Sequence, residues 1–250
     1  LGCPKWTLSQ ILEFAVKNGY SGIEIRGILG EMNLVKRPEF NSSAAIAATR
    51  KQFADKGLKV VNLGASSELH HADQTLRKNQ LDSAKQFIDL SAALGSPFIR
   101  VFPNSFPKER SKAATIDLIS EGLQQLGAYA KGTGVSVLME THGDVVKSDD
   151  LLQIMQQANG PNVGLVWDFY NMWTITHEAP AAVYAKLHQF IRHTHFKDSR
   201  KVGDKENYVF LGRGDAPSAE VIGILKKNGY KGFYSFEWEK MWHPEIAEPE

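Results

Sequence analysis

The stretch VSVLME at Val135–Glu140 is an apolar run of strand-forming residues that ends on a carboxylate. In a parallel strand covered by helices, alternate side chains face the helices and the interior of the sheet, and both sets are normally apolar. If Val137 and Met139 face the helices, Glu140 faces inward at the carboxyl end of the strand. A carboxylate at a position where an apolar side chain is expected indicates a functional role rather than a packing role.

Runs of this kind recur along the whole chain, each followed by an amphipathic segment and a glycine-containing turn. The expected strands are Leu1–Pro4, Gly22–Arg26, Lys59–Leu63, Phe98–Phe102, Val135–Glu140, Val163–Asp168, Ile191–Phe196 and Gly232–Glu237. The expected helices are Thr7–Asn18, Ser43–Lys56, Asp73–Leu94, Lys112–Gly132, Ser148–Ala158, Pro180–Gln189 and Pro217–Asn228. Strict alternation predicts a parallel sheet with helical crossovers, and eight such units close most naturally as a barrel. We therefore expect an α/β protein, a (β/α)8 TIM barrel that forms a single domain over residues 1–250, with a doubly wound open sheet as the alternative.

The helix ends carry local signals of their own. Thr7 and Ser43 are expected N-caps. Glycines occupy the positions just after four helices, where the backbone takes a positive φ; they are Gly19, Gly57, Gly95 and Gly229. The tail Lys240–Glu250 begins what would be an eighth helix, but it is short and contains two prolines, so it is expected to be truncated or irregular.

Composition excludes several classes of partner. Twenty-nine basic and 28 acidic side chains leave a formal charge of +1, so no global field attracts nucleic acid or an anionic membrane. No run reaches the roughly 18 apolar residues that a membrane span requires. The single cysteine, Cys3, excludes an internal disulfide and a cysteine zinc site, and it favours a reducing, cytoplasmic location. A small-molecule partner is therefore expected, and a homo-oligomer stays open.

The chain begins at Leu1 without a methionine, in what the pattern predicts to be the middle of a strand. This start indicates that residues upstream of Leu1 have been lost. It also leaves room for a removed signal peptide.

The alternation that places Glu140 inside the sheet can be extended to three later strands. It puts Asp168, His195 and Glu237 on the inner side, again at carboxyl ends. One such residue alone is more often a cap or an ion-pair partner, but four on one rim are not explained in that way. Three carboxylates and an imidazole without a cation would be costly to bury. We therefore expect one divalent metal ion, and this donor set suits Mn²⁺, Mg²⁺, Co²⁺ or Zn²⁺.

Short motifs at these strand ends resemble a known family. They are LMETH at Leu138–His142, VWD at Val166–Asp168, HFKD at His195–Asp198, GRGD at Gly212–Asp215 and FE at Phe236–Glu237. In order and spacing, over essentially the whole chain, they resemble the sugar phosphate isomerase/epimerase group of xylose isomerase-like barrels, which includes ketose 3-epimerases and inosose dehydratases. The resemblance implies that Glu140, Asp168, His195 and Glu237 bind one Mn²⁺-like ion, and that the two glutamates exchange protons with substrate.

A metal at this rim would support chemistry on a hydroxyketone. The ion would polarise a carbonyl and acidify the adjacent C–H, which gives a metal-stabilised enediolate. We assign Glu140 and Glu237 as the acid/base pair of a sugar or sugar phosphate isomerase or epimerase. Loss of water from the same enediolate would make the protein an inosose-type dehydratase instead, and a non-catalytic sugar-binding barrel is a further alternative.

Other polar residues near the strand ends are candidates for binding substrate. They are Lys197, His142, Arg100, Glu24, His70 and Arg213. Three have a plain structural alternative: Lys197 can be a solvated loop lysine, Arg213 can pair with Asp215, and Glu24 can pair with Arg26.

Asn171 departs from the family pattern, because many relatives carry Asp-x-x-His where this chain has Asp168 followed by Asn171. The apurinic endonucleases of the same superfamily use three zinc ions and need that histidine. The GRGD stretch lacks their Asp-x-His pair, and no basic cluster would follow a phosphate backbone. An endonuclease is therefore the least favoured reading.

Overall fold

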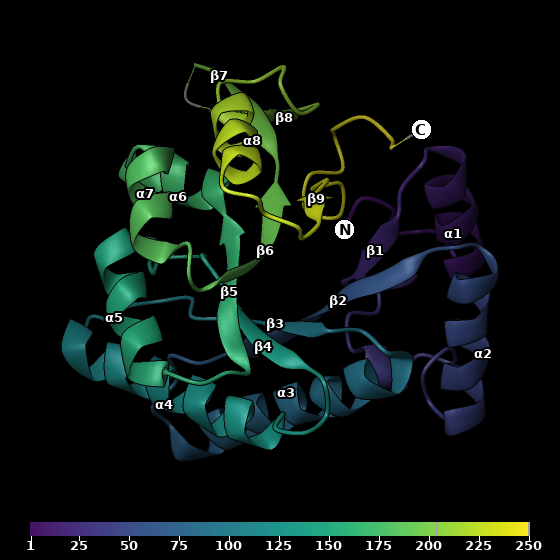
Figure 1. The fold of residues 1–250 in the computed structure, drawn as a ribbon, viewed down its shortest axis with the longest axis horizontal. Helices are drawn as coiled ribbons and strands as arrows, with labels where there is room; N and C mark the ends of the chain where they lie inside the picture. Colours follow the sequence, from purple (N-terminus) through teal and green to yellow (C-terminus); the bar gives the residue numbers. More distant parts are fainter. Residues whose placement is uncertain (204, 250) are drawn as a thin grey trace.

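The computed structural model describes residues 1–203 and 205–249, and its central feature is a parallel sheet curved into a nearly closed barrel with helices outside (Figure 1). Seven strands follow the order β1-β2-β3-β4-β5-β6-β9. They are β1 Gly22–Ile25, β2 Lys59–Glu68, β3 Phe98–Phe102, β4 Ser136–Glu140, β5 Val163–Asp168, β6 Ile191–Phe196 and β9 Tyr234–Phe236. The predicted α/β barrel class is confirmed.

The helices of the described residues connect the strands along the chain. They are α1 Leu8–Lys17, α2 Ser43–Asp55, α3 Gln74–Leu94, α4 Lys112–Tyr129, α5 Ser148–Ala158, α6 Phe169–Thr176, α7 Pro180–Leu187 and α8 Ser218–Lys227, with a 3-10 turn η1 at Leu34–Lys36. The seven predicted helices are all present. None of the helices in the described part of the chain is long and apolar enough to cross a membrane.

The predicted first strand is wrong. Leu1–Pro4 does not join the sheet, and β1 and β9 are its two edges. The segment instead enters a turn closed by a hydrogen bond from Trp6 N–H to the Cys3 carbonyl. Pro4 lacks the N–H that a strand residue donates, so the local chemistry favours the turn. The tail forms no helix between residues 240 and 249.

The N-cap of α1 is the predicted residue, whereas the N-cap of α2 is the residue before the predicted one. Thr7 caps α1 through a reciprocal capping box with Gln10. For α2 the cap is Ser42 rather than Ser43, because the Ser42 hydroxyl accepts the Ala45 N–H. The four predicted glycines all have positive φ, as at Gly95, where φ is 75°.

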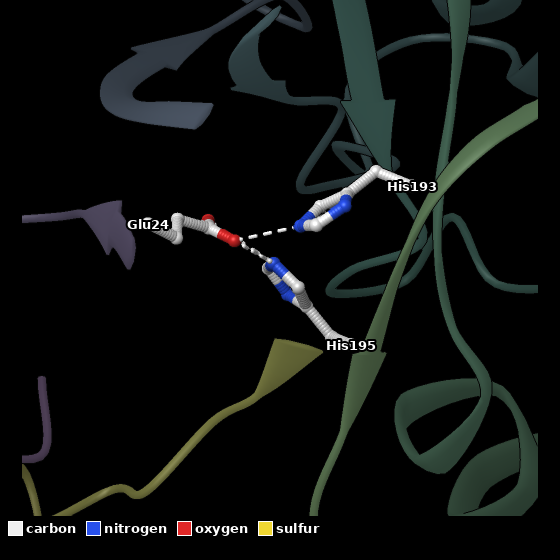
Figure 2. A group of neighbouring side chains, drawn as sticks. All are labelled: Glu24, His193 and His195. Carbon is white, nitrogen blue, oxygen red and sulfur yellow. Dashed lines mark hydrogen bonds and ion pairs between the residues drawn. The ribbon is translucent and has the colours of Figure 1, made fainter. Parts of the chain in front are cut away.

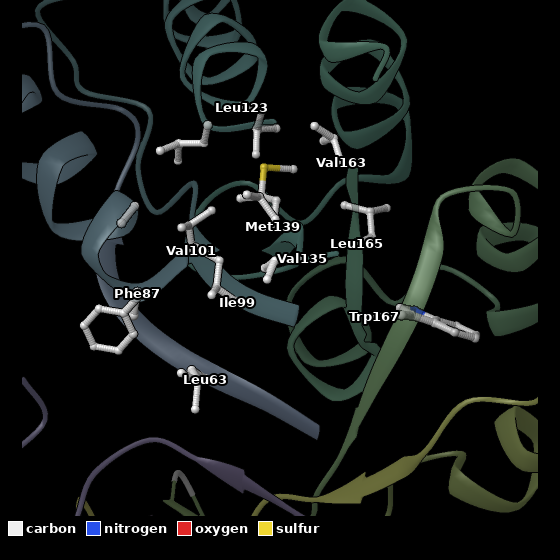
Figure 3. Packing of buried hydrophobic residues seen from close by; sticks show 14 of the residues in the cluster. Leu63, Phe87, Ile99, Val101, Leu123, Val135, Met139, Val163, Leu165 and Trp167 are labelled. Carbon is white, nitrogen blue, oxygen red and sulfur yellow. The ribbon is translucent and has the colours of Figure 1, made fainter. Parts of the chain in front are cut away.

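The main core lies between the sheet and the helices, as Figure 3 shows. Val137 and Met139 on β4 are completely buried, and Leu123 of α4 belongs to the same cluster. Burying each such side chain contributes about 1.5–3 kcal/mol. Because the helix-facing set is apolar as predicted, the opposite set, including Glu140, faces the barrel interior.

An antiparallel hairpin follows β6 and was not predicted. It consists of β7 Asp198–Val202 and β8 Lys205–Val209. The Tyr170 hydroxyl of α6 donates to Ser199 Oγ at 2.6 Å, which joins the hairpin to α6. The hairpin thus begins directly after the strand that carries His195.

Candidate metal centre

Four side chains from neighbouring strands converge at the carboxyl end of the barrel. Glu140 ends β4, Asp168 ends β5, His195 lies on β6, and Glu237 follows β9 directly. Each offers one ligand atom, and these atoms lie within 4.8 Å of one another. The sheet order makes β4, β5, β6 and β9 consecutive, which explains how residues far apart in sequence share one rim.

The imidazole of His195 has two distinct sides. Its Nε2 lies 2.9 Å from Glu24 Oε2 (Figure 2). Its Nδ1 lies 3.7 Å from Glu140 Oε1 and 3.8 Å from Glu237 Oε2. The Nε2–H donates to Glu24, and Nδ1 is directed at the carboxylates. Burial opposes a charged ring, but Glu24, Glu237 and Glu140 raise the His195 pKa well above its usual value, so a bound cation would replace the proton on Nδ1. A carboxylate that holds the far nitrogen of a histidine is the usual support of a metal-ligating imidazole.

Glu24 is fixed by several donors. His193 Nε2 lies 2.9 Å from its Oε2, as seen in Figure 2, and Asn62 Nδ2 donates to its Oε1 at 3.1 Å. Burial works against the charge of Glu24, yet His195 and His193 hold its pKa well below the usual range. The predicted alternative partner, Arg26, instead donates to the Gly64 carbonyl and to a serine hydroxyl.

Lys197 is buried among carboxylates, so the reading as a solvated loop lysine is wrong. Its Nζ lies 2.8 Å from Asp168 Oδ2, 2.7 Å from Glu237 Oε2 and 3.0 Å from Glu239 Oε1. Burial opposes the ammonium charge, but these carboxylates raise the Lys197 pKa well above its usual value. The ammonium partly neutralises the acidic cluster.

Asp168 divides its two oxygens between structure and the cluster. Oδ1 accepts the Asn171 N–H at 3.0 Å and caps α6, while Oδ2 faces Lys197. The Asn171 side chain donates to the Thr141 carbonyl at 3.2 Å. Asn171 therefore fastens the end of β4 to α6. Burial, with the nearby Glu237, raises the Asp168 pKa to about 6.

Glu140 is held by Arg100. The Arg100 Nε lies 2.9 Å from Glu140 Oε2, and both side chains are only 2% exposed. The guanidinium also lies 3.8 Å from the ring centre of Phe102 and donates to the Ala65 carbonyl. Burial disfavours the Glu140 carboxylate, but Arg100 and His195 hold its pKa far below the usual range. Glu140 is thus ionised near neutral pH.

The other predicted substrate residues lie outside the group of four ligand side chains; they are His142, His70 and Arg213. His142 Nδ1 lies 2.9 Å from Asn104 Oδ1. His70 lies beside Glu68 and His71 in the loop after β2. Arg213 is exposed and forms no ion pair among residues 1–203 and 205–249, so the predicted pairing with Asp215 is not found.

Three residues were missed by the sequence analysis. His193 and Glu239 share the inward alternation with His195 and Glu237, so the same rule would have found them. Asp198 was quoted only as part of a motif. Its carboxylate accepts the backbone N–H groups of Gly212, Gly214 and Ala216. This cradle explains why the HFKD and GRGD motifs occur together.

The donor set fits a divalent cation. His195 Nδ1 is buried and has no hydrogen-bond partner among the described residues, and the Lys197 ammonium is the contact of Asp168 Oδ2. Three carboxylates and one imidazole suit metals such as Mn²⁺, Mg²⁺, Co²⁺ and Zn²⁺. A cavity of about 740 Å³ between β1 and β9 reaches Glu24, His195 and Glu237. A small molecule therefore has space beside the cluster.

Comparison with known proteins identifies the family. A family model for the xylose isomerase-like TIM barrel matches residues 12–250. The chain belongs to that family. The resemblance drawn from the strand-end motifs is confirmed.

Curated relatives carry names of two activities. An inosose isomerase of Halalkalibacterium halodurans is 26% identical over 243 residues, which cover 92% of this chain and 82% of the relative. An inosose dehydratase of Clostridium beijerinckii is 29% identical over 150 residues, 53% of this chain and 49% of the relative. These relatives favour an enzyme of the isomerase class, with dehydration as the second activity.

A solved structure shares the fold. The IOLI protein with a bound zinc atom superposes with a TM-score of 0.83 at 20% identity, over 99% of this chain and 90% of that one. This likeness shows the fold of the barrel.

Proposed function

We propose that the protein is a divalent-metal-dependent isomerase or epimerase of a sugar or polyol. The observation that carries the proposal is the convergence of three carboxylates and one ring nitrogen within 4.8 Å. They lie at the carboxyl ends of barrel strands, where TIM-barrel enzymes bear their active sites. The inosose isomerase relative supports the reaction class.

Glu140, Asp168, His195 and Glu237 would hold the ion, and we propose Mn²⁺ in the cell because most of the donors are hard oxygens. A bound divalent ion supplies Lewis acidity, which polarises a substrate carbonyl and acidifies the neighbouring C–H. The zinc atom bound by the IOLI protein, which shares this fold, supports metal binding.

Glu140 and Glu237 are proposed to move the proton. Their strands, β4 and β9, are separated in the sheet by β5 and β6, so the two carboxylates approach the reacting carbon from different directions. Burial opposes ionisation of Glu237, but Lys197 and His195 lower its pKa. Each glutamate can therefore start as a base. One removes a proton from one face of the carbon. The other takes a proton from solvent water and returns it on the opposite face, after which the first glutamate releases its proton to solvent.

Lys197 and His142 lie beside the ligand set on the same rim. We propose that they contact substrate hydroxyls once a bound cation takes over carboxylates that hold the Lys197 ammonium in the metal-free protein. Glu24 and Arg100 have protein partners at 2.9 Å. We therefore assign Glu24 the role of orienting His195, and Arg100 that of holding Glu140. Both are positioning residues rather than substrate contacts.

The test is solvent deuterium exchange into substrate. Metal-loaded protein is incubated in D₂O with a panel of ketoses, inososes and sugar phosphates, and the labelled carbon is located by NMR. Glu140→Gln and Glu237→Gln should abolish exchange, whereas Glu13→Gln, on the exposed face of α1, should exchange like the wild type. Unimpaired exchange in both active-site variants would remove the assignment.

Dehydration is the second candidate, favoured by the inosose dehydratase relative. Elimination of a β-hydroxyl needs the same C–H deprotonation, followed by departure of water. Mass spectrometry of the products separates the outcomes, because dehydration lowers the mass by one water and isomerisation leaves it unchanged.

A further inference from the structure

A second group of metal-type side chains lies at the end of β2. Glu68 is the last residue of that strand, and His70 and His71 follow in the loop that leads to α3. His71 Nε2 lies 2.9 Å from Glu68 Oε2, and His70 Nδ1 lies 4.0 Å from the same oxygen. One ligand atom of each residue lies within 4.8 Å of the others. None of the three belongs to the cluster around Asp168.

His70 is oriented as a metal ligand would be. It is only 9% exposed, and its Nδ1 is buried without a hydrogen-bond partner among the described residues. Its Nδ1 lies 4.0 Å from Glu68 Oε2, a separation too long for a hydrogen bond. A neutral imidazole with its proton on Nε2 would present an Nδ1 lone pair to a cation held between the two residues.

The distances in this group suit a small cation. A tetrahedral zinc ion with bonds of about 2.0–2.2 Å places its ligand atoms about 3.3–3.6 Å apart. The two separations from Glu68 Oε2, 2.9 Å and 4.0 Å, lie on either side of that value. Changes of about 0.5–0.6 Å would bring these two separations to that value. Two imidazoles and one carboxylate favour Zn²⁺ over Mg²⁺, which prefers oxygen ligands.

The loop backbone that carries the histidines is fixed by two arginines. Arg110 Nη1 donates to the His70 carbonyl at 3.0 Å, and Arg77 Nη1 donates to the Leu69 carbonyl at 3.1 Å. The imidazole rings lie with their centroids 4.1 Å apart. The donor atoms are thus arranged before any ion binds, which lowers the ordering cost of binding.

We propose that Glu68, His70 and His71 form a second divalent-cation site that takes Zn²⁺ and leaves a fourth position for water or a substrate oxygen. The site shares no ligand with the proposed catalytic centre, so it stands independently of the proposed function. The two are nevertheless neighbours on the barrel rim. Glu68 is paired with Phe102 across β2 and β3, and the guanidinium of Arg100, which binds Glu140, lies over that ring.

The experiment counts zinc ions bound by the full chain. Protein freed of metal with a chelator is titrated with Zn²⁺ by calorimetry, and the bound metal is then measured by elemental analysis. We expect two ions per chain for the wild type and one each for Glu68→Gln, His71→Asn and Asp168→Asn. His188→Asn removes an exposed histidine at the end of α7 and should still bind two ions. Thermal melts without metal check that each variant is folded.

Each outcome assigns or removes a site. One ion in the wild type, lost in Asp168→Asn and kept in His71→Asn, overturns the second site alone. One ion that is lost in His71→Asn but kept in Asp168→Asn would support the second site and remove the metal from the proposed function. Anomalous scattering at the zinc edge in crystals of the wild type should give a peak between Glu68 and His70, and its absence at saturating zinc overturns the proposal even if a folded variant is not obtained.

Discussion

Glu24 accepts a hydrogen bond from His195 Nε2 at 2.9 Å, on the side of the imidazole that faces away from Glu140 and Glu237. The two residues are 171 positions apart in the sequence. The contact fixes the ring orientation that presents Nδ1 to the carboxylates. A residue of β1 thereby orients a proposed metal ligand on β6.

Glu24→Gln should weaken metal binding, because an amide is a poorer acceptor for the Nε2–H and no longer raises the basicity of the ring. Loss of such support typically lowers metal affinity 10–100-fold. Calorimetric titration with Mn²⁺ or Zn²⁺ measures the change. Ser235→Ala is the matched control, since the Ser235 hydroxyl donates to the same carboxylate at 3.3 Å but is not the group that orients the His195 ring. Equal affinities for Glu24→Gln and the wild type would argue against a positioning role.

Lys197→Met should destabilise the metal-free protein. The ammonium contacts Asp168, Glu237 and Glu239, and removing one partner of a buried ion pair typically costs about 3–5 kcal/mol. Urea unfolding in the presence of a chelator gives the change in the free energy of unfolding. Lys112→Met breaks a half-exposed pair with Asp150 and should cost less than about 1 kcal/mol. Similar losses for both variants would mean that Lys197 does not stabilise the cluster.

The period of the strands made much of this site predictable. Alternation along β4, β5, β6 and β9 is local information, and it gave Glu140, Asp168, His195 and Glu237 their inward direction. Contacts that form only when the barrel closes could not be predicted from this alternation. The contact of Glu24 with His195 needs β1 to approach β6 across the interior, and nothing local to either residue encodes that approach.

The errors in the fold have local causes. The segment Leu1–Pro4 has the apolar residues of a strand, but a strand also needs a neighbouring strand to pair with. Pro4, which lacks a backbone N–H, favours the turn that the structure contains. The short helix α6 begins directly at the end of β5, because Asp168 serves as its N-cap. Asp168 therefore faces the proposed metal and also caps a helix, and the strand pattern predicts only the first of these roles.

Glu39→Gln should make the protein less stable at neutral pH but not in acid. Arg37 holds Glu39 through two hydrogen bonds, at 2.8 and 3.0 Å. Burial works against ionisation, yet Arg37 lowers the pKa of Glu39 below 4.5. A carboxyl whose pKa is lower in the folded state stabilises the protein above its unfolded pKa, and that stability is lost as the pH falls through the folded pKa.

The measurement for Glu39 is the free energy of unfolding of wild type and variant from pH 7 to pH 3. We expect a difference of up to about 1 kcal/mol at pH 7, shrinking below pH 4.5. Arg37→Gln should reproduce the same trend, because it removes the same pair. A difference that stays constant over the whole range would show that the carboxylate charge is not responsible.

Gly64→Ala should disturb the support of Glu140 from a distance. A Cβ at this position of β2 would lie 2.6 Å from Arg26 Cδ and 3.0 Å from Arg100 Nη2, so at least one guanidinium must move. Overpacking of this kind typically costs about 1–3 kcal/mol, and a shift of Arg100 should also lower turnover by loosening Glu140.

Gly223→Ala is the opposite case, because that glycine is inside α8 and an added Cβ meets nothing within 4 Å. Alanine there should stabilise the helix by about 0.5–1 kcal/mol. Gly64→Ala should therefore lower the thermal midpoint and Gly223→Ala should raise it. If both variants raise it, the packing of Arg100 against Gly64 does not hold Glu140 in place.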